Sequence, residues 1–166
     1  MELLWAPWRL SYVQKVTKSK RERCFICDAF NDVPENDRKN LLLHRGKKAL
    51  VILNRFPYNT AHLMVCPVRH TGDFESLLPE EMLEIDELLK KAIRVIKKAY
   101  NPDGFNIGLN LGKVSGGSVD THIHYHVVPR WSGDTNFMPV IGEVKVIPQA
   151  LGETYDILKK VWSEDD

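Results

Sequence analysis

The chain has 166 residues, of which 43% are apolar, so it has enough material for one globular domain with a full hydrophobic core. Its 23 basic and 22 acidic residues give a formal net charge of +1, which excludes the strongly basic surface typical of proteins that bind nucleic acid polymers. No apolar run approaches the roughly 20 residues that span a bilayer, so we expect a cytoplasmic protein with no membrane partner.

The first segment, residues 1–23, is expected to be an N-terminal arm, because it has tryptophan anchors at its start and a basic, polar run at its end. Directly after it comes Cys24-x-x-Cys27. In a reducing compartment a pair at this spacing is more often metal-binding or redox-active than part of a disulfide framework.

The next part of the chain predicts strands. Two apolar runs within residues 41–53, separated by Arg45-Gly46-Lys47, are typical of a β-hairpin. A loop with proline and asparagines covers residues 54–60, and residues 61–67 are predicted to form the next strand.

The periodicity then changes from strand to helix. Apolar residues recur at intervals of three and four from Pro79 to Tyr100, which predicts a long amphipathic helix. Residues 105–109 are predicted to form a strand beside the histidine-rich segment that follows. A second helix is expected over about residues 148–162, with Tyr155, Leu158, Val161 and Trp162 as its buried stripe. This order of strands, helix and strands favours an α+β fold with an antiparallel sheet and helices on one face.

The segment Gly116 to Trp131, GGSVDTHIHYHVVPRW, carries the strongest signal in the chain. His122, His124 and His126 occupy alternate positions, so a β-strand would place all three imidazoles on one face, about 6.6 Å apart, and the intervening apolar residues in the core. Pro129 is expected to end the strand's hydrogen bonding because it has no N–H. Three neighbouring imidazoles discourage one another from charging, so the row is interpreted as a functional site.

His-Ile-His-Tyr-His-Val-Val resembles the His-φ-His-φ-His-φ-φ signature of the histidine triad (HIT) superfamily, whose members transfer or hydrolyse nucleotidyl groups. The resemblance covers about residues 20 to 135. It implies a HIT-like fold, in which a five-stranded antiparallel sheet carries a long helix, usually in a homodimer. We therefore expect the arm at 1–23, a HIT domain at 24–140 and a C-terminal helical segment at 141–166.

The resemblance implies that His124 is a nucleophile that forms a covalent nucleotidyl-imidazole, and that His126 donates to a phosphate oxygen. A neutral imidazole suits the attack because its ordinary pKa, near 6.5, leaves it largely unprotonated at neutral pH. The backbone N–H groups of Gly117 and Ser118 could also bind phosphate, although this run could equally be a tight turn alone.

Many triad hydrolases have glutamine four positions before the first histidine, where this chain has Ser118. The run from Asn110 to Trp131 resembles the diadenosine tetraphosphate phosphorylase branch, in which inorganic phosphate resolves the intermediate. The expected substrate is thus a dinucleoside polyphosphate, with phosphate favoured over water as the acceptor.

The stretch from Asn54 to Pro67 resembles the family's ribose-binding loop and strand, with Thr60-Ala61 where the family commonly has Pro-Gly. By matching position, Asn54 would bind the ribose hydroxyls and His62 would lie near the base or sugar. Asn110 could reach a phosphate or ribose, and Trp131 could wall the pocket or pack on a partner subunit.

Zinc-bearing relatives complete a four-ligand site with a histidine after the ribose strand and the first triad histidine. The matching set here is Cys24, Cys27, His70 and His122, which implies a structural zinc that holds one end of the catalytic segment.

Other functions stay open from the sequence. The substrate could be a nucleoside phosphoramidate, or the protein could bind nucleotides without catalysis. A catalytic metal held by all three triad histidines is disfavoured, because rings at alternate positions of one strand converge poorly on one ion.

Overall fold

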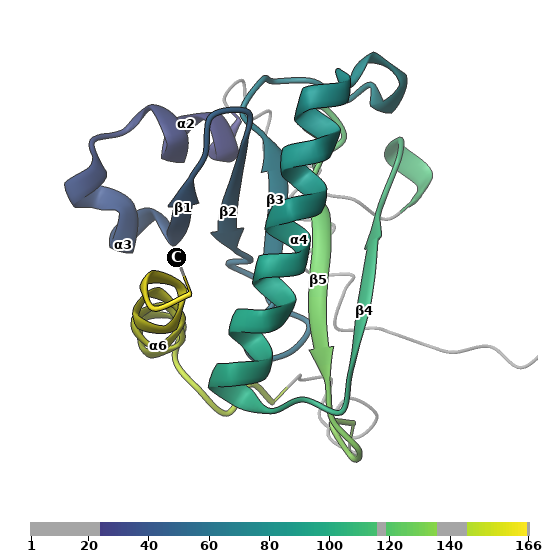
Figure 1. The fold of residues 1–166 in the computed structure, drawn as a ribbon. Helices are drawn as coiled ribbons and strands as arrows, with labels where there is room; N and C mark the ends of the chain where they lie inside the picture. The colour runs from purple at the N-terminus through teal and green to yellow at the C-terminus, as the bar shows by residue number, and fades with distance from the viewer. Residues whose placement is uncertain (1–23, 116–118, 136–145, 166) are drawn as a thin grey trace, which may run out of the picture.

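The computed structural model describes residues 24–115, 119–135 and 146–165 (Figure 1). The strands are β1 (Leu42–Arg45), β2 (Ala49–Leu53), β3 (Leu63–Pro67), β4 (Gly104–Leu109) and β5 (Tyr125–Arg130). The helices are α2 (Phe25–Asn31), α3 (Asp37–Asn40), α4 (Pro79–Tyr100) and α6 (Leu151–Ser163), with 3₁₀ turns η1 (Pro34–Asn36), η2 (Phe74–Ser76) and η3 (Lys113–Ser115).

The strands form one five-stranded sheet in the order β1-β2-β3-β5-β4, and every neighbouring pair is antiparallel. The predicted hairpin is confirmed as β1 and β2, and β4 lies beside the triad strand β5 as expected. The fold is the predicted α+β arrangement of an antiparallel sheet with helices, but the helices are not confined to one face, because α2 packs on the face opposite α4.

Helix α4 lies across one face of the sheet and has the predicted bounds (Figure 1). Pro79 suits its first turn, where an N–H would have no partner in the helix. The Leu78 N–H donates to Glu81 Oε2 at 2.9 Å, and Asn101, with φ 45°, ends the helix in the left-handed conformation.

The sheet is covered on both faces at its β1–β3 end. On the face of α4 and α6, the core includes Val51, Leu53, Ile96 and Leu158. On the other face a smaller cluster includes Ile26 of α2 together with the strand residues Leu42, Leu50, Ile52, Met64 and Cys66. Because β2 and β3 are buried on both sides, they are wholly apolar, whereas β1 ends in the half-buried His44 and Arg45.

Helix α6 runs along the outer edge of β1 and bonds to its backbone. Tyr155 Oη donates to the Leu42 carbonyl at 3.1 Å, and Lys159 Nζ donates to the Leu43 carbonyl at 2.8 Å. The helix begins three residues later than predicted, and Val161 of the expected stripe is only half-buried. The other edge strand, β4, is largely exposed.

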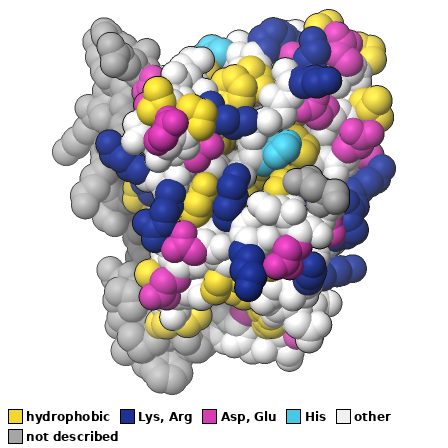
Figure 2. All heavy atoms as spheres, turned by 60° about the vertical axis from the view of Figure 1, so that its left-hand side comes forward, with side chains coloured by type: hydrophobic (Ala, Val, Ile, Leu, Met, Phe, Trp, Pro, Cys, Tyr) yellow, Lys and Arg dark blue, Asp and Glu magenta, His cyan; other side chains and the backbone are white. Residues whose placement is uncertain are grey.

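Among the helices of the described residues, none combines the length and apolar composition that crossing a bilayer requires. Figure 2 shows Lys and Arg side chains interspersed with Asp and Glu over the face that it presents. The mixed charge fits the near-neutral composition and the expectation of a small ligand rather than a nucleic acid polymer.

Candidate active site

The expectation that all three triad histidines belong to one strand is wrong. Strand β5 begins at Tyr125, so His122 and His124 precede it. The β3–β5 ladder ends at the pair Val65 and Tyr125, and the Ile123 N–H donates instead to the carbonyl of Thr71, at 2.7 Å. The segment leaves the ladder at Pro67. This residue has no N–H to donate, and its carbonyl accepts a hydrogen bond from His122 Nε2 at 2.8 Å.

Pro129 does not end the strand either. It lies within β5 opposite Phe105, and the pairing with β4 continues to Arg130. Only the ladder with β3 ends earlier, at Val127. Because proline lacks a donor on one side only, it is tolerated where β5 has a single neighbouring strand.

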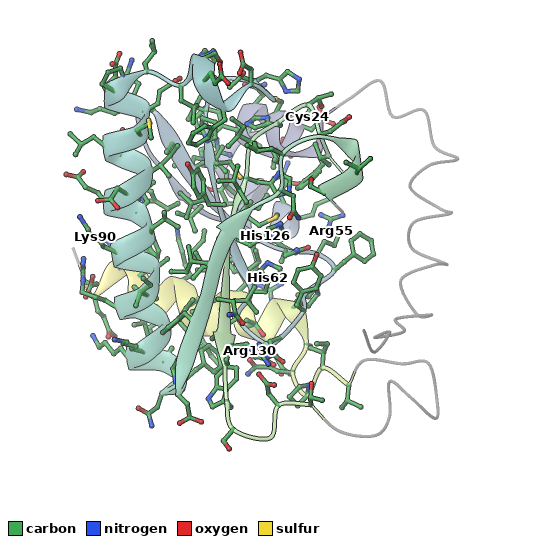
Figure 3. The ribbon with its side chains drawn as sticks, turned by 90° about the vertical axis from the view of Figure 1, so that its right-hand side faces the viewer. Cys24, Arg55, His62, Lys90, His126 and Arg130 are labelled. Atoms are coloured by element: carbon green, nitrogen blue, oxygen red, sulfur yellow. The ribbon has the colours of Figure 1, made fainter. Side chains whose placement is uncertain are left out.

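The alternation of polar and apolar side chains nevertheless survives through this segment. Ile123 and Val127 are buried in the core under α4. The rings of His124 and His126 lie edge to face, with centroids 4.9 Å apart. Figure 3 shows His126 and His62 on the side of the sheet away from α4, which carries Lys90.

His124 is held in one tautomer. Its Nδ1 lies 2.8 Å from the carbonyl oxygen of His122, and a carbonyl can only accept, so Nδ1 carries the proton. Nε2 therefore keeps its lone pair. The residue is 6% exposed, and burial lowers the pKa of its imidazole. His124 is consequently a neutral imidazole with a nucleophilic nitrogen.

His126 is oriented by His62, a contact that sequence reasoning missed. The Tyr58 N–H donates to His62 Nδ1 at 3.1 Å, so the proton of His62 is on Nε2, which lies 2.9 Å from His126 Nδ1. His126 therefore accepts at Nδ1 and carries its own proton on Nε2. Burial, and then repulsion from His126 and His124, lowers the pKa of His62 to about 3, so this residue stays neutral.

His122 turns towards a separate cluster at the other end of the segment. The ligand atoms of Cys24, Cys27, His70 and His122 all lie within 4.8 Å of one another. His122 Nδ1 is 3.3 Å from Cys24 Sγ, 3.5 Å from Cys27 Sγ and 3.2 Å from His70 Nδ1. Donor atoms around a tetrahedral zinc lie roughly 3.3–3.8 Å apart, so these four residues fit a metal ion.

This cluster separates His122 from the other two triad histidines. Within the described residues, the group that could hold a metal includes neither His124 nor His126. A catalytic metal bound by the three imidazoles together therefore has no support in the geometry.

A hollow of about 340 Å³ opens beside His126, over β4 and β5. Its lining residues are Tyr58, Asn106, Ile107, Gly108, Leu109, Asn110, Ser115, His126 and Val128. Another hollow, of about 390 Å³, lies between His44 of β1 and Glu87 to Arg94 of α4, and it contains none of the triad histidines. Of these two hollows, only the smaller one is lined by a triad histidine.

Comparison with known proteins agrees with this geometry. The family model described as "HIT domain" matches residues 35–133. The chain belongs to the HIT family. It is 42% identical to the AP-4-A phosphorylase of Mycobacterium tuberculosis over 166 residues, which cover 98% of this chain and 85% of that protein. It is also 30% identical to an adenosine 5'-monophosphoramidase of Schizosaccharomyces pombe over 107 residues, covering 64% and 74% of the two chains.

Solved structures show the same fold. A zinc-bound histidine triad family protein from Mycobacterium smegmatis superimposes with a TM-score of 0.61 and 26% identity, covering 75% of this chain and 84% of that one. A HIT family protein from Bacillus anthracis has a TM-score of 0.54 and 26% identity, with coverage of 82% and 95%.

The HIT pattern also explains a strained residue in the loop before His62. Ala61 has a φ of 60° and is 2% exposed, at the position where the family commonly has glycine. A left-handed conformation costs a residue with a Cβ roughly 1–2 kcal/mol. The loop thus keeps the backbone course that glycine favours, and it directs His62 to His126.

The remaining predicted ligands of the nucleotide are placed as follows. Asn54 begins the loop, and its Oδ1 accepts the Phe56 N–H at 2.9 Å while its Nδ2 lies 3.4 Å from His62 Nδ1. Asn110 lines the hollow. Trp131 is half-buried and its Nε1 donates to the Tyr100 carbonyl at 3.4 Å. Gly117 and Ser118 lie outside the described residues.

Proposed function

We propose that this HIT protein transfers a nucleotidyl group from a dinucleoside polyphosphate such as diadenosine tetraphosphate to inorganic phosphate. The observation that carries the proposal is the bond from His124 Nδ1 to the His122 carbonyl, because it leaves Nε2 as a neutral nucleophile. The 42% identity to a mycobacterial AP-4-A phosphorylase supports the choice of substrate and acceptor.

In the first step His124 Nε2 attacks the α-phosphorus of the retained nucleotide. The P–N bond forms as the phosphoanhydride P–O bond breaks, and the rest of the substrate leaves as a nucleoside polyphosphate. His126 Nε2–H donates to a non-bridging oxygen and stabilises its developing charge, since His62 holds the other nitrogen as an acceptor. Gly117 and Ser118 are proposed to add backbone donors to the same phosphate.

In the second step an oxygen of inorganic phosphate attacks the phosphorus of the intermediate. The P–N bond breaks, His124 is regenerated as a neutral imidazole, and a nucleoside diphosphate is released. With water as the attacking group, the product is a nucleoside monophosphate. Asn54 is proposed to bind the ribose of the retained nucleotide, because a side-chain amide can both donate to and accept from a vicinal diol.

We propose zinc as the metal of the Cys24, Cys27, His70 and His122 cluster. Two thiolates and two imidazoles are a donor set that suits zinc, and all four positions are filled by protein, as in a structural site. The ion would fix His122, whose carbonyl in turn fixes the His124 ring. Reduced cysteine ligands suit the cytoplasm.

A homodimer is proposed through β4. Among the described residues this strand pairs only with β5 and forms an edge of the sheet, and Ile107 on it is 46% exposed. Exposed strand edges are templates for pairing with another chain. Trp131 and Asn110 are proposed to complete the nucleotide site near that edge.

Mass analysis of the products tests the proposed reaction. Diadenosine tetraphosphate with phosphate should give ATP and ADP, whereas hydrolysis would give ATP and AMP. His124→Ala should reduce turnover by more than about a thousandfold, because the covalent route is lost. His44→Ala, which changes a histidine outside the site, serves as the control. Appearance of neither ADP nor AMP with the wild-type protein would refute the proposal.

The same reaction chemistry allows a second substrate class. The 30% identity to an adenosine 5'-monophosphoramidase favours nucleoside phosphoramidates as the alternative. Assaying adenosine 5'-monophosphoramidate alongside diadenosine tetraphosphate decides between them, since the preferred substrate is the one with the higher kcat/KM.

A further inference from the structure

The hollow beside His126 contains polar residues to which neither step above gives a role. We infer that it is the binding site of the leaving nucleoside polyphosphate and that Asn106 donates a hydrogen bond to it. This inference rests on the proposed function, because it assigns a binding site to the nucleotide that leaves in the first step. It adds Asn106, Gly108 and Tyr58 to the residues that recognise substrate.

Strand β4 presents an alternating pattern to the hollow. Asn106 and Gly108 are separated by two, so they share the face of β4 that His126 and Val128 share on β5, and Asn110 follows directly after the strand. Gly108 lies directly opposite His126, and Asn106 lies opposite Val128. A Cβ placed on Gly108 would meet nothing within 4 Å. The backbone at Gly108 is therefore open to a ligand next to His126, and the side-chain amides of Asn106 and Asn110 lie before and after it in the chain.

The amide of Asn106 is fixed in one orientation by Arg130. Arg130 Nη1 lies 2.7 Å from Asn106 Oδ1, and because a guanidinium has only donors, the oxygen of the amide must face it. The Nδ2 end keeps its hydrogens for an acceptor on a ligand. Phosphate and ribose oxygens are such acceptors.

Arg130 is itself held rigidly. Its Nε and Nη2 donate to the two carboxylate oxygens of Asp134, at 2.6 and 3.0 Å. Asn59 Nδ2 donates to the same carboxylate at 2.7 Å and to the Pro129 carbonyl at 3.1 Å. The carboxylate accepts from several donors, Arg130 above all, and these hold the pKa of Asp134 well below its usual range. A support of this kind keeps Asn106 in place before any ligand arrives.

Position and chemistry both favour the leaving nucleotide over the retained one. In an in-line displacement the attacking and leaving atoms lie on opposite sides of phosphorus. The hollow is lined by His126 but by neither His124, the proposed attacking residue, nor Asn54, the proposed ribose ligand, so it is distinct from the residues assigned to the retained nucleotide. Among the described residues that line it there is no carboxylate, which suits a polyphosphate. The Tyr58 ring, 42% exposed, offers a surface on which a base can stack.

Binding measurements on the His124→Ala variant test the inference without turnover. AMP at saturating concentration occupies the proposed retained-nucleotide side, and titration calorimetry then measures the affinity for ATP, the leaving nucleotide of diadenosine tetraphosphate. We expect ATP to bind in the presence of AMP. If AMP abolishes ATP binding, one site serves both nucleotides and the inference is wrong.

Gly108→Val fills the floor of the hollow and should lower the ATP affinity by at least about tenfold, the equivalent of ~1.4 kcal/mol. The matched control is Gly104→Val, on the same face of the same strand and outside the hollow, where a Cβ also meets nothing within 4 Å. Valine suits a strand, so both variants should fold. Unchanged ATP affinity in Gly108→Val overturns the inference. If that affinity is intact but light scattering shows a changed molecular mass, the hollow is a contact between subunits.

Asn106→Asp keeps the shape of the side chain and its contact with Arg130, but it replaces the donor by an acceptor. ATP affinity should again fall about tenfold or more at unchanged molecular mass, whereas Asn31→Asp, the same change on the exposed surface of α2, should have no effect. If ATP affinity survives in Asn106→Asp while wild-type protein converts diadenosine tetraphosphate, this inference fails and the proposed function stands. If the wild-type protein converts nothing, the proposed function fails, and the ATP titrations still report on the hollow.

Discussion

His62 Nε2 lies 2.9 Å from His126 Nδ1, and this bond links the residue that precedes β3 to strand β5. Met64, not His62, is directly opposite His126 in the β3–β5 ladder, so the two histidines meet as diagonal neighbours. Because Tyr58 fixes the tautomer of His62, the proton that His126 offers to a ligand is determined by the loop before β3.

Replacing His62 should therefore impair catalysis through His126. His62→Leu is expected to lower kcat by about 10- to 100-fold, somewhat less than the loss of an entire oxyanion donor, because His126 can still adopt the required tautomer part of the time. His62→Gln places an amide N–H near the position of Nε2 and should restore most of the rate. Steady-state kinetics on both variants measure the difference, and equal losses would show that His62 only fills space.

The neutral state of His62 should also make stability depend on pH. Its folded pKa of about 3 lies below the unfolded value near 6.5, so between these values the unfolded chain binds the additional proton. Stability is then full above pH 6.5 and falls as the pH decreases towards 3. At pH 5 this one residue should reduce the free energy of unfolding by about 2 kcal/mol relative to pH 8. Urea unfolding of the wild type and His62→Gln at both pH values isolates the contribution, which should vanish in the variant.

The sequence predicted the fold wherever the local spacing of apolar residues or the turn residues determine the secondary structure. The three- and four-residue spacing predicted α4, Pro79 and Asn101 mark its ends, and the β1–β2 hairpin followed from its turn residues. The start of β5 could not be predicted from the sequence, because His122, His124 and His126 alternate in the same way whether or not the residues before Tyr125 pair with a neighbouring strand. The ring of His122 bonding to Pro67 decided that boundary, and it is a long-range contact.

The metal cluster and the His62 contact show the same limit at the level of the site. The four candidate metal ligands could be named because the resemblance supplied the two distant histidines, and the structure brings their donor atoms together. The partner of His62 depended on the register between β3 and β5, which nothing local in either strand encodes. For the same reason the position of Asn106 beside the triad is visible only once β4 pairs with β5.

Metal binding should be measurable as a stability increment. We expect one zinc per chain, and zinc at a thousandfold above its Kd adds about 4 kcal/mol of stability. For a chain of this size, removal by a chelator should then lower Tm by roughly 8–16 °C. Cys27→Ser should lose the metal, whereas His44→Ala, a histidine outside the cluster, should keep it. Elemental analysis and thermal unfolding give both readings, and a wild-type protein without metal would exclude the site.

Gly72 should be required for the course of the segment that carries His122. The chain passes so close to it that a Cβ on Gly72 would clash with the carbonyl of Asp120 and lie 3.0 Å from Thr121 Cα, both backbone atoms. Gly72→Ala must therefore displace residues 120–122, which we expect to cost about 1–3 kcal/mol in the free energy of unfolding. Because His122 holds both the metal cluster and the His124 ring, metal affinity and kcat should fall with it. Gly104→Ala, where the added Cβ meets nothing, is the comparison for urea unfolding and metal titration, and equal behaviour of the two variants would contradict this role of Gly72.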